Sequence, residues 1–164
     1  KKLAELKLPL ITHPGSEFAL PVVDRSLGEP SFLRPALDCG VRVIFAHGLS
    51  SGVFFHERYF NTAKELIKTY PNLFLDASAL TLPTRMRMLL KIRDNPEIKE
   101  RLLFGSDYPL PAFSSLLRPF MRRSGYPEVK AEGNYFDRLV LIFRALGIDF
   151  SISLQDKLID KPVG

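Results

Sequence analysis

Four short apolar runs, each ending in a histidine or an aspartate, constrain the fold of this chain more than any other feature. The runs end at His13, His47, Asp76 and Asp107. Consecutive end points lie roughly 30 residues apart, which is the length of one β-strand plus one crossover helix. We therefore predict an α/β fold in which successive parallel strands deliver these four side chains to one end of a sheet. The carboxyl ends of parallel strands are where such folds carry out chemistry.

Apolar periodicity and breaker residues predict the individual elements. The expected strands cover residues 8–13, 41–46, 73–75 and 102–104, and helices are expected over 32–39, 56–70, 83–94 and 134–147. Residues 41–46 are almost continuously apolar, as in a parallel strand that is covered on both faces. The Pro-, Ser-, Arg- and Gly-rich stretch 110–133 is expected to be mostly loop with one helical turn near 114–118. We place one domain at residues 1–147 and expect 148–164 to form a loosely packed tail.

The amino-acid composition limits the kinds of molecule that this chain is expected to bind. The formal net charge of +5 comes largely from residues 85–101 and 118–123, where basic residues alternate with helix formers. These residues are not interleaved with exposed aromatics, so we expect no nucleic-acid partner. No apolar run approaches the ~20 residues that cross a bilayer, so we expect no membrane partner and a cytoplasmic location. The single cysteine, Cys39, cannot form an intramolecular disulfide.

His13, His47 and Asp107 are the residues with the strongest chemical potential. His13 precedes Pro14 and Gly15, and a neutral imidazole at that strand end can coordinate a divalent metal. Asp107 can bind the same metal and take the proton of a metal-bound water. His47 can be a second ligand or a general acid-base. The alternative interpretations are a surface-loop histidine for His13 and a loop-capping carboxylate for Asp107.

Two further carboxylates are candidates for supporting roles. Asp76 ends a strand, where its carboxylate can simply satisfy nearby backbone N–H groups. Glu17 lies four residues beyond His13 and is a candidate substrate-binding residue.

The segment 48–52 offers a rival signal, because Gly-Leu-Ser-Ser-Gly matches the G-x-S-x-G nucleophile elbow and follows a predicted strand. The elbow requires the chain order Ser, then Asp or Glu, then His. No histidine follows Asp76 or Asp107, so the sequence disfavours a serine hydrolase.

The segments around the four end points resemble those of the amidohydrolase-related metal-dependent hydrolases of the amidohydrolase superfamily. The resemblance lies in residues 12–17 (Thr-His-Pro-Gly-Ser-Glu), 43–48 (Val-Ile-Phe-Ala-His-Gly), 70–76 (Tyr-Pro-Asn-Leu-Phe-Leu-Asp) and 100–109 (Glu-Arg-Leu-Leu-Phe-Gly-Ser-Asp-Tyr-Pro). Members fold as (β/α)8 TIM-type barrels, and these segments match strands five to eight. The resemblance implies that His13 is a metal ligand and that His47 binds a second metal or acts in catalysis. It also implies that Asp107 binds metal and shuttles protons, with zinc as the expected ion.

The family's first-strand His-x-His pair is missing, because the chain has three histidines and no two are separated by a single residue. A barrel usually needs about 250 residues, so we expect this chain to be the carboxyl-terminal half of a longer protein. A half-barrel that closes its sheet as a homo-oligomer is the alternative. The activity implied is hydrolysis of a small-molecule amide, ester or lactone by metal-activated water. Decarboxylation of an aromatic acid and a non-catalytic α/β binding module remain the alternative functions.

Overall fold

A computed structural model describes residues 1–15, 24, 28–52 and 57–150 of the chain. Its elements, in chain order, are α1 (Lys2–Glu5), β1 (Leu10–Thr12), η2 (Pro30–Leu33), α2 (Arg34–Asp38), β2 (Val43–Phe45), η3 (Ala46–Leu49), α3 (Phe60–Thr69), β3 (Leu73–Asp76), α4 (Met86–Arg93), α5 (Pro96–Lys99), β4 (Leu102–Leu103), η4 (Arg118–Phe120), α6 (Gly125–Ala131) and α7 (Tyr135–Ala145). Within the described residues, no helix combines the length and apolar character needed to span a bilayer.

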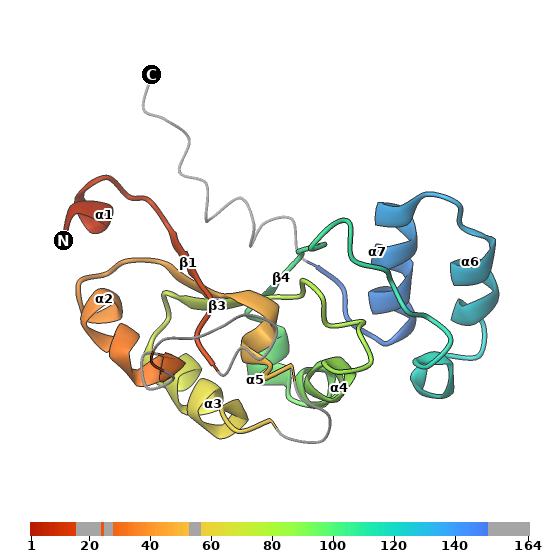
Figure 1. Ribbon diagram of the computed structural model, residues 1–164, viewed down its shortest axis with the longest axis horizontal. Coiled ribbons are helices and arrows are strands. Elements are labelled where there is room, and N and C mark those ends of the chain that lie inside the picture. The colour runs from red at the N-terminus through yellow and green to blue at the C-terminus, as the bar shows by residue number, and fades with distance from the viewer. Residues whose placement is uncertain (16–23, 25–27, 53–56, 151–164) are drawn as a thin grey trace.

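The four strands form one parallel sheet in the order β1-β2-β3-β4. Ile11 of β1 lies opposite Ile44 of β2, which lies opposite Phe74 of β3. Parallel neighbours need a crossover connection, and helices between the strands provide it. Figure 1 shows α2, α3, α4 and α5 on the same side of the sheet. The predicted α/β class and the predicted parallel strands are confirmed.

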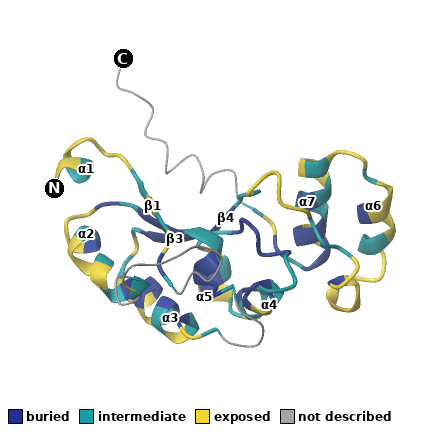
Figure 2. Cartoon of the chain, viewed as in Figure 1, coloured by how far each residue is buried: buried dark blue, intermediate teal, exposed yellow. Residues whose placement is uncertain are grey.

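Side chains on the two faces of the sheet enter two separate apolar clusters. Val43 and Phe45 share one face of the sheet, because successive side chains of a strand point to opposite faces. Both are fully buried in the main core, which includes residues of the covering helices. Ile44, between them, belongs to a second buried cluster with Phe74 and Leu103. Figure 2 shows the buried residues concentrated in the strands and on the helix surfaces facing them. The prediction of a strand covered on both faces is therefore confirmed, although β2 occupies only residues 43–45 of the predicted 41–46.

The stretch 110–133 is less irregular than its composition suggests. It contains the short η4 and the two-turn α6, so the prediction of a mostly loop segment is wrong at residues 125–131. The α6 helix is stabilised by packing against α7: Val129 is fully buried, and a Cβ placed on Gly125 would lie 2.6 Å from Ala145 Cβ. Helices this short owe their stability mainly to such tertiary contacts, which leave little trace in local composition.

Packing also continues beyond Gly147. Ile148 is buried, and the ring of Phe150 makes edge contacts with Phe104 and Phe143 at centroid distances of 5.4 and 5.0 Å. The first residues of the expected tail, 148–150, therefore belong to the packed structure. The rest of that segment, 151–164, lies outside the described residues.

Asn134 caps α7, and its replacement gives a direct test of this helix. The Asn134 side chain accepts hydrogen bonds from the backbone N–H groups of Phe136 (2.8 Å) and Asp137 (3.2 Å). We expect Asn134→Ala to lower the free energy of unfolding by about 0.5–2 kcal/mol, as loss of an N-cap usually does. Urea denaturation checks this value. Asn134→Ser, which keeps a capping oxygen, is the matched control, and equal losses in both variants would contradict the capping role.

Candidate active site

The carboxyl ends of β1 and β2 bring the first two predicted residues together. Thr12 lies opposite Phe45 in the parallel register, so the chain segments that follow them leave the sheet at the same edge. The rings of His13 and His47 meet edge to face, with centroids 4.8 Å apart and an interplanar angle of 68°. His13 is exposed, whereas His47 is partly buried.

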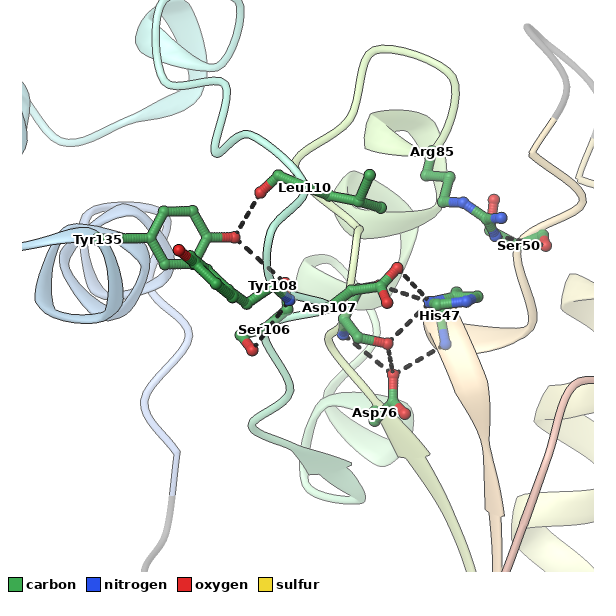
Figure 3. Close-up of polar contacts among 10 residues, drawn as sticks. His47, Ser50, Asp76, Arg85, Ser106, Asp107, Tyr108, Leu110 and Tyr135 are labelled. Atoms are coloured by element: carbon green, nitrogen blue, oxygen red, sulfur yellow. Dashed lines mark hydrogen bonds and ion pairs between the residues drawn. The ribbon is translucent and has the colours of Figure 1, made fainter. Parts of the chain in front are cut away.

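Asp107 joins them from the segment that follows β4. Its Oδ2 lies 3.9 Å from His47 Nδ1, and Figure 3 shows the carboxylate directed at the imidazole. The side chain of Asp107 is 39% exposed and that of His47 only 14%. The predicted convergence of two imidazoles and a carboxylate at one edge of the sheet is therefore present.

Left-handed backbone accompanies this convergence. His47 and Asp107 have φ values of 55° and 53°, and Leu49 has a φ of 64°, a region that non-glycine residues adopt at a cost of roughly 1–3 kcal/mol. Gly48 lies between two of them, and a Cβ there would approach Ile92 Cδ1 to 2.8 Å. Such local strain clusters at functional sites, where surrounding contacts must maintain it.

Hydrogen bonds to Asp76 maintain the backbone at His47. Asp76 Oδ1 accepts the His47 N–H (2.8 Å), the Ser78 N–H (3.0 Å) and the Ser78 hydroxyl. On its other side, His47 Nδ1 lies 3.1 Å from the Ser78 carbonyl and 2.8 Å from Ser78 Oγ. Asp76 thus satisfies backbone N–H groups, one of the interpretations open from the sequence. Ser78 is a residue that the sequence reasoning missed, and its position two residues after a strand-end aspartate is the only local signal for it.

Burial is the main influence on the charge of His47. It lowers the pKa of this imidazole below its ordinary value, and the positive charge of Arg85 lowers it further. The hydrogen bond to the Ser78 carbonyl acts in the opposite direction. His47 is therefore neutral at neutral pH, the form in which an imidazole binds a metal or accepts a proton.

The loop after His47 is held by a second carboxylate. The Ser50 hydroxyl donates to Glu57 Oε1 (3.0 Å), the Ser51 N–H donates to Glu57 Oε2 (3.1 Å), and Arg85 Nη1 donates to the Ser50 carbonyl (3.2 Å). Ser50 is almost fully buried. This serine therefore braces the loop through a carboxylate, unlike the exposed nucleophile of an elbow, which faces a histidine base.

Glu57 gives a prediction on pH. Burial raises the pKa of this carboxyl above its ordinary value, although its hydrogen bonds to Ser51 and Ser50 oppose the shift. A carboxyl group whose pKa is higher in the folded state than in the unfolded state stabilises the fold at low pH. This contribution is lost as the pH rises through the pKa that the group has in the folded state. Glutamine resembles the protonated form of the glutamate side chain. We therefore expect the stability of Glu57→Gln relative to wild type to be higher at about pH 8 than at about pH 4. Urea titrations at the two pH values measure this, and an equal effect at both would contradict it.

Glu17, the predicted substrate-binding residue, lies outside the described residues. Over the described ranges, no group of three or more His, Cys, Asp or Glu side chains is arranged so that it could hold a metal ion. The donor types at the edge, two imidazoles and a carboxylate from His13, His47 and Asp107, are nevertheless those that zinc prefers.

Fold and site together define an α/β protein that presents two histidines and an aspartate at the carboxyl edge of a parallel sheet. Comparison of the chain with protein-family models, with curated proteins and with solved structures gave no match.

Proposed function

We propose that this chain carries the catalytic edge of a metal-dependent hydrolase of the amidohydrolase type, acting on an amide, ester or lactone. The observation that supports the proposal is the meeting of His13, His47 and Asp107, three residues far apart in sequence, at one end of a parallel sheet. The strand order β1-β2-β3-β4 with helices on one side is also what one half of a (β/α)8 barrel would have.

In this proposal His13, His47 and Asp107 would hold a zinc ion. Zinc would supply a water whose pKa is lowered toward neutrality. The exposed carboxylate of Asp107 accepts the proton of the attacking water. Neutral His47, buried beside it, ligates through a ring nitrogen or accepts a proton.

Metal binding by His13 tests the proposal. We expect the protein to bind one zinc ion and His13→Ala to weaken binding at least as much as the roughly 10- to 100-fold that loss of an outer-shell partner costs. Isothermal titration with zinc, followed by metal analysis after dialysis, measures this. Cys39→Ser is the control, because Cys39 is an exposed thiol at the end of α2. Zinc affinity that is unchanged in His13→Ala, or lost in Cys39→Ser, would refute the assignment.

A non-catalytic α/β binding module is the second candidate. A protein that is fully folded by circular dichroism and binds no zinc would support the module. Stoichiometric zinc together with hydrolysis of a p-nitrophenyl ester would support the enzyme.

A further inference from the structure

We infer that Asp76 and Ser78 are positioning residues that hold the proton of His47 on Nδ1 and leave the lone pair on Nε2. Figure 3 shows Asp76 joined to the backbone of His47 by one of the hydrogen bonds on which this inference rests. Neither Asp76 nor Ser78 belongs to the set of three residues that carry the proposed chemistry.

The hydrogen-bond donors and acceptors around Nδ1 determine where the proton lies. The Ser78 carbonyl oxygen, 3.1 Å from Nδ1, can only accept, so a hydrogen bond between these atoms requires an N–H on Nδ1. The Ser78 hydroxyl has one hydrogen, and an ionised carboxylate can only accept. That hydrogen is donated to Asp76 Oδ1, so Ser78 Oγ, 2.8 Å from Nδ1, is left as an acceptor. Both oxygens of Ser78 therefore require the same tautomer of His47.

Asp76 orients the backbone of His47 as well as its ring. The Asp76 oxygen that accepts the Ser78 hydroxyl also accepts the backbone N–H of His47 at 2.8 Å. His47 is one of the residues with a left-handed backbone, at a φ of 55°. One carboxylate oxygen thereby couples the strained backbone to the orientation of Ser78 and, through it, to the imidazole. Chains of this kind set the tautomer of catalytic and metal-binding histidines.

The end of β4 leaves room for this arrangement. A Cβ added to Gly105 would lie 3.1 Å from Ser78 Cβ and 3.5 Å from Asp76 Cβ. A larger residue at position 105 would displace Ser78 from His47. Asp107 Oδ2, at 3.9 Å from Nδ1, is beyond hydrogen-bond distance, so Ser78 receives the proton of Nδ1 and Asp107 does not.

The role that this tautomer gives His47 in catalysis rests on the proposed function, whereas the assignment of the tautomer itself does not. With Nδ1–H donated to Ser78, only Nε2 of neutral His47 can bind zinc or take a proton. His47 then enters the reaction as a ligand or base. It has no free N–H with which to stabilise a developing oxyanion.

Nuclear magnetic resonance of the metal-free protein tests the tautomer directly. Long-range ¹H–¹⁵N correlation spectra distinguish Nδ1–H from Nε2–H, and the chain has only three histidines to assign. At about pH 8, above the ordinary histidine pKa of about 6.5, we expect His47 of the wild type to be predominantly Nδ1–H. This is the minor form of an unconstrained histidine.

Two substitutions separate positioning from general stability. We expect Ser78→Ala, which removes the shorter of the two contacts with Nδ1, to leave both tautomers populated. Asp76→Asn retains the Oδ1 that accepts all three hydrogen bonds and is expected to keep Nδ1–H predominant. Ser50→Ala is the matched control, because it removes another buried serine–carboxylate hydrogen bond and should leave the His47 tautomer unchanged.

Two results would overturn the inference as a whole: an Nε2–H wild type, or the same change of ratio in Ser50→Ala. A Ser78→Ala variant with the wild-type tautomer ratio would overturn the role of the Ser78 hydroxyl, and with it that of Asp76, and would leave only the residue-78 carbonyl as the group that holds the proton. Zinc added to the wild type provides the separate test of the proposed function. A shift confined to the Nε2 resonance of His47 supports zinc binding at the nitrogen we assign, and a shift of Nδ1 with loss of its proton contradicts it. A protein that binds no zinc would refute the proposed function and leave the tautomer result standing.

Discussion

Asp107→Asn is expected to lower the rate of ester hydrolysis by the zinc-loaded protein by about 10²–10⁴-fold, the range that a positioned general base contributes. Asparagine keeps the shape of the side chain and an oxygen for hydrogen bonding, but it cannot accept the proton of the attacking water. The carboxylate is 39% exposed and faces His47 at 3.9 Å, so both solvent and the neighbouring imidazole can reach it. Steady-state kinetics with a p-nitrophenyl ester would measure the loss.

Asp137→Asn is the matched control, because Asp137 is an exposed carboxylate in the first turn of α7 and is not one of the three residues to which the proposal assigns chemistry. It should keep the wild-type rate. If both variants hydrolyse the ester equally fast, Asp107 does not act as the base. If zinc affinity also falls in Asp107→Asn, the residue is a ligand as proposed, and the rate measured at saturating zinc decides whether it is the base as well.

Phe45→Ala is expected to have the largest effect on stability, about 3–5 kcal/mol lost from the free energy of unfolding, as is usual for truncation of a fully buried phenylalanine. Phe45 has no exposed surface and lies in β2, between β1 and β3, on the face covered by helices. Its truncation removes apolar burial and leaves a cavity that neighbouring strands cannot fill. Urea denaturation monitored by circular dichroism would measure the loss.

Ile11→Ala is the corresponding control on the edge strand β1. Ile11 is 65% exposed, and surface substitutions usually change stability by no more than about 0.5 kcal/mol. A loss in Phe45→Ala as small as that in Ile11→Ala would mean that the sheet is not packed as described. A large loss in Ile11→Ala would mean that another part of the molecule covers this strand in solution.

Local patterns predicted the frame of the fold. The four apolar runs and their spacing indicated parallel strands, and these strands are present in chain order. The i, i+3, i+4 spacing after Asn134 and the capping asparagine predicted α7, which begins at Tyr135 as expected. By contrast, α6 has little periodicity of its own and depends on contacts with α7, such as that between Gly125 and Ala145. Helices of this kind escape sequence reasoning because their stability comes from a neighbour.

By itself, the sequence determined that His13, His47 and Asp107 each follow a strand of a parallel α/β sheet, because strand spacing and apolar runs are local properties. The tertiary structure alone decided how His47 is held. His47 has a left-handed backbone. It contacts His13 and forms hydrogen bonds with Asp76 and Ser78, residues that lie about 30 positions away in the sequence. Such contacts obey no periodicity along the chain, since they exist only once neighbouring strands have brought their carboxyl ends together.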